Sequence, residues 1–325
     1  MLNKTSRRSP SPGAPALAVL VTGLAVIAGS ALWLAWTTGG EIRYTADHGG
    51  TRPMWHVWVP VLAGLLLTRL LPPRPPRGDG APVTRELRLQ AGVLLAAAVL
   101  FAVTLRLVTA GHAAEPAHTI LKLVLLVAVP LLLFRLTRRG APDREVAAPA
   151  SRDASDREAV PSSRTARRDA TRGQEARERP SAWRRYGPAV PVAAWIVLSF
   201  AGPFARPYGD WTSGLDPVTV LVTMVTVFVL NALIEEIFYR RWLQTRWEHL
   251  LGPWPAVVLA SLAFAAWHIG IQGTGDLPTD LASVFAGQGV QGLFLGYLWS
   301  RYRLMWPVLT VHGAMNAAPT LLGLL

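Results

Sequence analysis

The sequence contains no cysteine among its 325 residues. This absence excludes a disulfide framework, a cysteine-ligated zinc site and a thiol nucleophile. Charged residues are also scarce, at 16% of the chain, whereas hydrophobic residues account for 51%. The charges are unbalanced, with 32 Lys and Arg against 20 Asp and Glu and a formal net charge of +12. In a soluble protein this excess would favour an anionic partner such as nucleic acid.

The distribution of the charges predicts a different class of protein. Residues 138–185 contain 13 Arg and 8 acidic residues but almost no aliphatic side chains, so we predict a disordered cytoplasmic linker there. The rest of the chain has the composition of membrane-embedded segments. We therefore predict an integral membrane protein with no nucleic-acid partner. It would consist of an N-terminal membrane region (1–137), the linker (138–185) and a C-terminal membrane domain (186–325).

Apolar stretches long enough to cross a bilayer of about 30 Å recur along both membrane regions. Irregular backbone cannot face lipid, so each stretch is expected to be a helix. The predicted fold is an all-α, polytopic transmembrane bundle of about nine spans, or eight if the short fifth one does not cross. The predicted spans are Ala14–Trp36, Met54–Leu71, Leu89–Ala110, Thr119–Leu136, Pro188–Phe204, Pro217–Arg240, Pro255–Ile271, Leu281–Ser300 and Met305–Leu325.

The basic residues outside the spans predict the orientation of the chain. If the N-terminus lies in the cytoplasm, the loops on that side hold most of them, and the outer loops hold only Arg43, Arg52 and Arg206. The first span is then an uncleaved anchor rather than a signal peptide. An Ala- and Arg-rich composition is typical of bacteria of high genomic GC content, so we predict a multi-pass protein of the bacterial plasma membrane.

A few ionisable residues lie inside the predicted spans, where a charged side chain costs roughly 2.5–3.5 kcal/mol. Arg69, Arg106, Lys122 and Arg135 have long stems, and we expect them to extend to the membrane surface. The remaining four are functional candidates because intramembrane ionisable groups are usually retained for function. They are Glu235, Glu236, His268 and His312.

Helix geometry assigns different roles to the two glutamates. Residues four apart share a helix face, so Glu236 and Arg240 form a pair in which the arginine can neutralise the acid. Adjacent residues point about 100° apart, which leaves Glu235 on another face without a counter-charge nearby in the sequence. A buried carboxylate of that kind suits a general base.

The histidines occur in motifs of the same spacing. Phe264 and His268 are four residues apart, as are His312 and Asn316, whose imidazole and amide can both donate hydrogen bonds. A turn at Gly252-Pro253 would place Glu235 and His268 at one depth, because they lie 17 residues before and 16 residues after Gly252. At about 1.5 Å per residue, both are roughly 25 Å from that turn. We therefore expect the histidines and Glu235 to meet in the cytoplasmic half of the membrane.

Together, Glu-Glu-x-x-x-Arg (Glu235, Glu236, Arg240), Phe-x-x-x-His (Phe264, His268) and His-x-x-x-Asn (His312, Asn316) resemble the three motifs of the CPBP family. This family, also called Abi or CAAX-protease-like, groups CAAX prenyl protease 2 with bacterial bacteriocin-processing and lysostaphin-resistance-like proteins. The resemblance covers about Pro188–Leu325. The first four spans and the linker resemble no family that we can name.

The resemblance implies a hydrolase, an intramembrane endopeptidase that cleaves a membrane-associated protein or peptide. By similarity, Glu235 and His268 would activate water, and His312 and Asn316 would form the oxyanion hole. Glu236 and Arg240 would orient the site, and Phe264 would pack against it. Among the roles known in the family, bacteriocin maturation or self-immunity is the one the resemblance suggests, and the partners would be the lipid bilayer and the substrate.

Three other functions compete with this one. Glu235, His268 and His312 could ligate zinc as a two-histidine, one-carboxylate set, although we favour a protease without a metal or other cofactor because no His-Glu-x-x-His is present. A non-catalytic membrane scaffold or immunity protein is a second alternative, but such relatives often lose motif residues. A transporter would need broken helices in paired halves, and the sequence does not show them.

Overall fold

The computed structural model describes residues 13–43, 50–73, 83–109, 114–139, 185–205 and 214–323. The linker predicted to be disordered lies outside these residues from 140 to 184. Several basic residues of the topology prediction also lie outside them, including Arg7, Arg8, Arg74 and Arg77. The orientation of the N-terminus and the domain boundaries therefore stay predictions.

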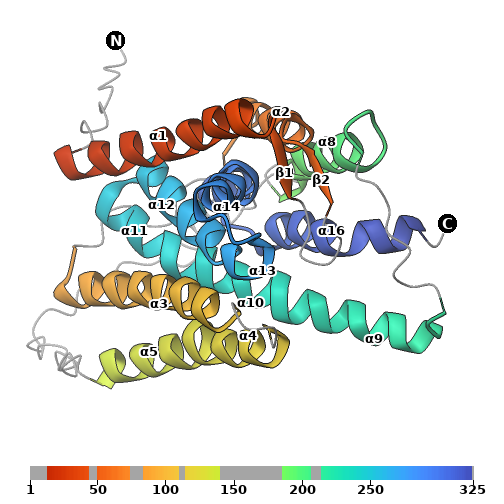
Figure 1. Cartoon of the computed structure of the whole chain (residues 1–325). Helices are drawn as coiled ribbons and strands as arrows, with labels where there is room; N and C mark the ends of the chain where they lie inside the picture. Colours follow the sequence, from red (N-terminus) through yellow and green to blue (C-terminus); the bar gives the residue numbers. More distant parts are fainter. Residues whose placement is uncertain are drawn as a thin grey trace, which may run out of the picture.

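The prediction of an all-α polytopic bundle is confirmed (Figure 1). Before the linker, the helical segments are α1 (Ala14–Thr37), α2 (Trp55–Leu70), α3 (Arg85–Thr109), α4 (Ala114–Lys122), η1 (Leu123–Ala128) and α5 (Val129–Arg139). After it come α8 (Ala189–Phe200), α9 (Pro217–Val227), η2 (Phe228–Leu233), α10 (Ile234–Glu236), η3 (Ile237–Gln244) and α11 (Thr245–Leu251). The chain continues through α12 (Pro253–Ala266), α13 (Ile269–Gln272), α14 (Leu277–Val284), η4 (Phe285–Gly289), α15 (Val290–Tyr302) and α16 (Met305–Gly323).

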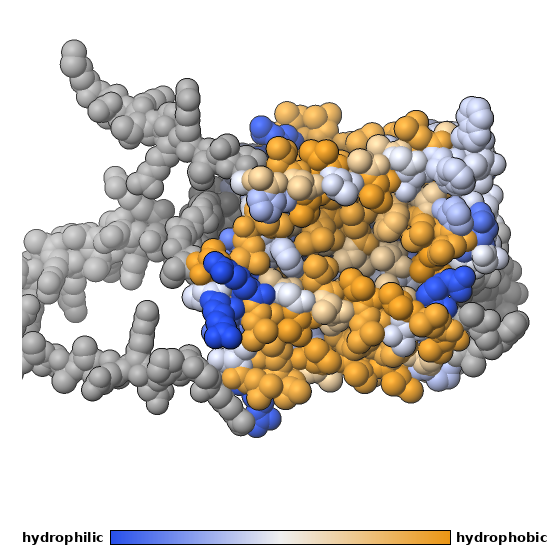
Figure 2. Space-filling view, turned by 60° about the vertical axis from the view of Figure 1, so that its left-hand side comes forward, coloured by the Kyte–Doolittle hydropathy of each residue, from blue (hydrophilic) through white to orange (hydrophobic). Residues whose placement is uncertain are grey.

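These helices have the length and surface of a membrane protein. Within the described residues, six are long and apolar enough to cross a bilayer, and α2 and α8 are shorter apolar helices. Figure 2 shows a broad hydrophobic surface over the middle of the bundle, with hydrophilic residues gathered toward its two ends. Many large hydrophobic side chains of the described residues are exposed, including Leu32, Leu107 and Val218. Such a belt is what a bilayer covers.

A small β-hairpin, which the sequence analysis did not predict, follows α1. Strand β1 (Glu41–Arg43) pairs antiparallel with β2 (Thr51–Pro53), and Ile42, the middle residue of β1, is buried. Arg43 Nη1 donates to the carbonyl of Gln272 at 2.9 Å, and its backbone amide donates to Ser283 Oγ at 3.2 Å. The hairpin therefore ties the end of α1 to the α13–α14 region.

The helices before and after the linker share two hydrophobic clusters. In the first, Leu34 of α1 and Val61 of α2 pack with Phe294 and Leu298 of α15. The approach of α2 is close, since a Cβ added at Gly64 would lie 2.7 Å from the Phe294 ring. In the second, α3 side chains pack with Phe264 of α12 and its neighbours. The two membrane regions are thus packed against each other.

The predicted turn at Gly252-Pro253 is confirmed. Helix α11 ends at Leu251, Gly252 has a φ of +85°, and α12 begins at Pro253. A positive φ favours glycine, and proline is well tolerated at the first position of a helix. The turn folds α12 back along the preceding helix, which brings Tyr239 edge-on against Phe264 at 5.5 Å between ring centroids.

Candidate active site

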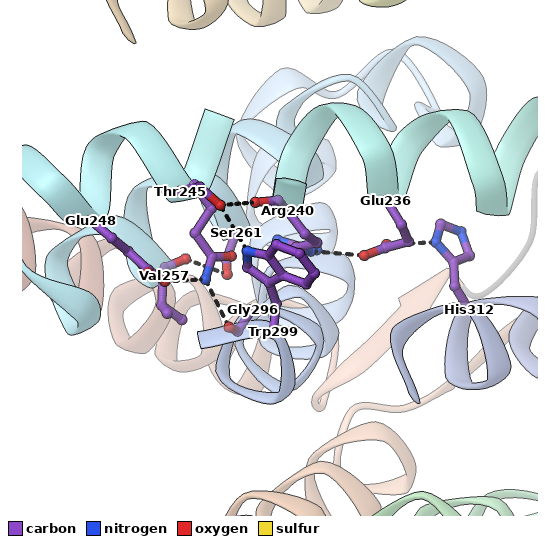
Figure 3. A network of polar contacts seen from close by, with 10 residues as sticks. Glu236, Arg240, Thr245, Glu248, Val257, Ser261, Gly296, Trp299 and His312 are labelled. Carbon is purple, nitrogen blue, oxygen red and sulfur yellow. Dashed lines mark hydrogen bonds and ion pairs between the residues drawn. The ribbon is translucent and has the colours of Figure 1, made fainter. Parts of the chain in front are cut away.

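Glu236 lies at the centre of a buried ionic network. Its Oε1 is 2.8 Å from His312 Nδ1, and its Oε2 accepts a hydrogen bond from Arg240 Nε at 3.1 Å. The Glu236 and Arg240 side chains are fully buried, and that of His312 is 5% exposed. Figure 3 shows the carboxylate between the imidazole of α16 and the guanidinium on its own helix. The predicted Glu236–Arg240 pair is therefore confirmed, and His312 is a second partner that sequence spacing did not predict.

Phe264 joins this network to the second histidine. The ring contacts His268 and His312 edge-on, with centroid distances of 5.0 and 5.7 Å, and the Arg240 guanidinium lies 5.1 Å from its centroid. The Phe264 carbonyl is 3.0 Å from His268 Nδ1. A carbonyl only accepts, so Nδ1 carries the proton and the lone pair of neutral His268 is on Nε2. The predicted packing role of Phe264 therefore includes fixing the tautomer of His268.

Glu235 has a partner that corrects the sequence analysis. No counter-charge lies near Glu235 along its own helix, but Lys122, which was expected to extend to the membrane surface, lies with its Nζ 2.7 Å from Glu235 Oε1. Both side chains are buried, with exposures of 2% and 1%. The ammonium also donates to Asn231 Oδ1 at 2.7 Å. The Lys122 side chain extends into the bundle because the Glu235 carboxylate there offsets the cost of burying its ammonium charge.

The Lys122 ammonium also lies near the end of α12, where His268 is located. Its Nζ lies 4.8 Å from the centroid of the Trp267 ring, and Trp267 is tilted over His268 at 3.9 Å. His118, one turn before Lys122, stacks on the other side of this group, 5.3 Å from Trp267. His118 is buried within α4, near the start of the span Pro116–Thr137. Glu235 and His268 thus share Lys122 as a neighbour, although no direct hydrogen bond between them is found in the described part of the chain.

Several buried polar atoms around these residues have no hydrogen-bond partner. Among the described residues they include Glu235 Oε2, Tyr239 Oη, Trp267 Nε1 and Asn316 Nδ2. Buried polar atoms are almost always paired with protein or water, and unpaired ones mark places where a ligand or water belongs. The site therefore offers a carboxylate oxygen and an amide donor to a bound molecule.

Asn316 lies beside a small cavity between α9 and α16. The cavity has a volume of about 30 Å³, and its walls are apolar apart from Asn316 and Thr223. The other lining residues are Met224, Val227, Phe228, Gly313 and Ala317. It has room for a water molecule or one small side chain.

The short helix α10, which carries both glutamates, lies between two π-helical segments, η2 and η3. A π-helical turn inserts an extra residue into the helix and changes the direction of the following side chains, and such turns are frequent at functional sites. Lys122 directly precedes another, η1. The apolar periodicity of the sequence did not indicate these three π-helical segments, although each lies next to an ionisable residue inside an apolar span.

The three residues considered as zinc ligands do not form a ligand set. Across the ranges that the structure describes, no three His, Asp or Glu side chains lie close enough together to hold a metal ion. Glu235 Oε1 faces Lys122 instead, and His312 Nδ1 faces Glu236. The arrangement therefore does not fit a zinc ion, and the roles proposed below use only groups of the chain.

Comparison with known proteins supports the resemblance drawn from the motifs. Residues 217–318, which include all the motif residues, match the family model of the Rce1-like type II CAAX prenyl endopeptidases. The resemblance stated from the motifs is thereby confirmed over this segment, which is similar to these membrane endopeptidases. The match leaves α1–α5 and α8 uncovered. No curated protein and no solved structure was found to match the chain.

Proposed function

We propose that this protein is an intramembrane endopeptidase that hydrolyses a peptide bond of a membrane-associated protein or peptide. The observation that carries the proposal is the pair of motif histidines on either side of Phe264, each with a different partner at Nδ1. His268 donates to a neutral carbonyl, whereas His312 faces a carboxylate. His268 therefore has its lone pair on Nε2, whereas His312 is held at Nδ1 by a charged group.

The neutral histidine and Glu235 are suited to activating water. His268 Nε2 has a lone pair, and Glu235 Oε2 is a buried carboxylate oxygen without a protein partner. A water molecule held by these groups would transfer a proton to Glu235 Oε2 as its oxygen attacks the scissile carbonyl carbon, and this proton would pass to the leaving amine nitrogen when the C–N bond breaks. General-base assistance of this kind contributes about 10²–10⁴-fold to a rate.

His312 and Asn316 are suited to stabilising the oxyanion. Glu236 holds His312 at Nδ1, which leaves Nε2 as the ring nitrogen that can face the oxyanion, and the Asn316 amide has an unpaired donor at Nδ2. Donors fixed where negative charge develops stabilise the transition state because they need no reorganisation. Glu236 and Arg240 hold His312 in place, and Phe264 separates the two imidazoles.

Substrate class and location belong to the same proposal. The name of the matched family suggests a peptide ending in a prenylated CAAX sequence. The bacterial origin inferred from the composition favours another membrane peptide, in bacteriocin maturation or self-immunity for example. We place the protein in the plasma membrane with its N-terminus in the cytoplasm.

The test uses the full chain reconstituted in lipid vesicles. Wild-type protein and Glu235→Gln are incubated with a farnesylated CAAX peptide and, separately, with a mixture of bacterial membrane peptides, and the products are identified by mass spectrometry. We expect wild-type cleavage and a loss of about 10²–10⁴-fold in kcat for Glu235→Gln. Glu41→Gln, a change of the same kind in the hairpin, serves as the control.

Two outcomes would contradict the proposal, the first in its metal-free mechanism and the second in its activity. Loss of activity with a chelator as well as with Glu235→Gln would indicate a zinc-dependent protease. If cells that carry Glu235→Gln keep the phenotype of cells that carry the wild-type protein, the protein would be a non-catalytic scaffold or immunity protein.

A further inference from the structure

We propose that Lys122, which lies outside the matched family segment, is a positioning residue for Glu235, holding one carboxylate oxygen so that the other faces the substrate. This inference rests on the proposed function, because it assigns Glu235 a role in activating water. The contact joins α4 to α10, two elements separated by more than 100 residues of sequence, at 2.7 Å. Figure 1 shows α3, α4 and α5 together at one side of the bundle, next to α10.

The ammonium group is held by three neighbours. Its Nζ donates to Glu235 Oε1 and to Asn231 Oδ1, each at 2.7 Å, and lies 4.8 Å from the centroid of the Trp267 ring. Asn231 is one turn before Glu235 on the same helix, so both oxygens approach from one face. Because two hydrogen bonds and a cation–π contact fix the ammonium, it can in turn fix the carboxylate.

The two carboxylate oxygens of Glu235 then have different surroundings. Oε1 is occupied by Lys122, whereas Oε2 is buried and has no hydrogen-bond partner. A carboxylate that rotated freely would exchange these positions. The clamp on Oε1 therefore determines which oxygen can receive a proton from water.

Helix α3 packs against both α13 and α4, the helix that ends at Lys122. Helix α13 approaches α3 so closely that a Cβ added at Gly270 would lie 2.7 Å from Leu105 Cγ and 3.3 Å from the Arg106 amide. Phe101 of α3 stacks on His118 and contacts Trp267, with centroid distances of 6.0 and 5.6 Å. The ring contacts among Phe101, His118 and Trp267 thus hold α4 against the end of α12.

The charge around Glu235 would be unbalanced without Lys122. Within the described residues, Arg240 and His312 are already paired with Glu236, and His268 donates through Nδ1 to a carbonyl. Tyr239, on the same helix as Glu235, is a neutral phenol, and His118 faces the aromatic rings of Phe101 and Trp267. A carboxylate buried without a cation is strongly disfavoured and tends to take up a proton. Lys122 is thus the cation that allows Glu235 to act as an ionised base.

The test compares Lys122→Met with Arg135→Met in the full chain. Both changes remove a basic side chain from the same span, but Arg135 is exposed on α5. The substrate is the peptide that wild-type protein cleaves in the test of the proposed function, and Glu235→Gln provides the baseline. We expect kcat of Lys122→Met to fall roughly 10- to 100-fold with KM within about twofold, and Arg135→Met to match wild type.

Infrared spectroscopy provides a measurement that needs no substrate. Lys122→Met should show a new C=O stretching band of a protonated carboxylic acid, which is absent from wild type and from the Lys122→Met/Glu235→Gln double variant. A lower kcat without this band would mean that Lys122 is only structural, and an unchanged or higher kcat would mean that it is dispensable or inhibitory. Either result overturns the inference. If wild-type protein cleaves neither the farnesylated CAAX peptide nor any of the bacterial membrane peptides, the proposed function fails, and the infrared band still decides whether Lys122 holds Glu235 ionised.

Discussion

Glu235 and Glu236 are adjacent in the sequence, but their carboxylates have different sets of hydrogen-bond partners. The Glu236 centre is closed, because Arg240 and His312 occupy both carboxylate oxygens and all three residues lie within the matched family segment. The Glu235 centre is open on one side, because Lys122 occupies one oxygen and the other has no partner. Its cation comes from α4, outside that segment.

The difference separates a structural carboxylate from a reactive one. A carboxylate with a protein partner at each oxygen, one of them an arginine, is stabilised as an anion, and both of its oxygens are occupied. A carboxylate with one buried, unpaired oxygen is costly in a folded protein, and such groups are retained mainly at functional sites. We therefore expect substitutions in the closed centre to affect stability most, and those around the open centre to affect turnover most.

The largest effect on stability is expected from Glu236→Gln. The change would leave the Arg240 guanidinium, which is fully buried, without its counter-charge. Removing one partner of a buried ion pair typically costs about 3–5 kcal/mol. Denaturant unfolding in detergent would measure the loss of unfolding free energy. Glu248→Gln on the same helix is the control, with a smaller expected loss because its partner Arg303 is partly exposed. Equal losses in the two variants would contradict the closed-centre interpretation.

A large effect on turnover with little effect on stability is expected from Asn316→Ala. The Nδ2 atom has no protein partner, so the substitution breaks no hydrogen bond through it. If the amide stabilises the oxyanion, kcat should fall by about 10²–10³-fold while the unfolding free energy changes little. Thr223→Val, which alters the wall of the same cavity, should leave kcat nearly unchanged. An equal fall in kcat for both variants would show that cavity shape, not the amide, matters.

The sequence predicted those parts of the site that depend on local spacing. The Glu236–Arg240 pair and the turn at Gly252 follow from residues that are near neighbours along the chain, and both are present. Long apolar stretches likewise predicted the helices, because a bilayer requires them. Tyr239 and Phe264, which lie 13 residues before and 12 residues after Gly252, are in contact, as a chain that folds back at this turn requires.

The Lys122–Glu235 contact could not be predicted from local spacing. Tertiary packing decides whether a lysine stem extends to the membrane surface or into the bundle, and spacing along α4 does not contain that information. The pairing of His312 with Glu236 was missed for the same reason, since it joins α16 to α10. One indication was available for Lys122, because His118 lies one turn before it and places a second ionisable side chain on the same face.

A third carboxylate, Asp216, extends the comparison to the water-exposed end of the helix that bears both glutamates. Its Oδ1 accepts hydrogen bonds from the amides of Val218 and Thr219, both at 3.0 Å, and its Oδ2 accepts one from the Thr219 hydroxyl. These bonds, the Thr219 hydroxyl first among them, lower the pKa of the Asp216 carboxyl below its usual value. The residue thus caps the N-terminus of α9.

The smallest predicted effect is that of Asp216→Ala, and it should depend on pH. Because the carboxyl pKa is lower in the folded state than in the unfolded state, the cap stabilises the protein above the unfolded pKa, and this contribution is lost as pH falls through the folded pKa. Thermal unfolding should therefore show a slightly lower Tm for Asp216→Ala at neutral pH and no difference in strong acid. Asp216→Asn keeps a capping side chain that does not titrate, so its Tm should stay near that of wild type at neutral pH. A difference between wild type and Asp216→Ala that persists unchanged in acid would mean that the side chain acts by packing. The stabilising effect of Asp216 would then not depend on its negative charge, in contrast to the two buried glutamates.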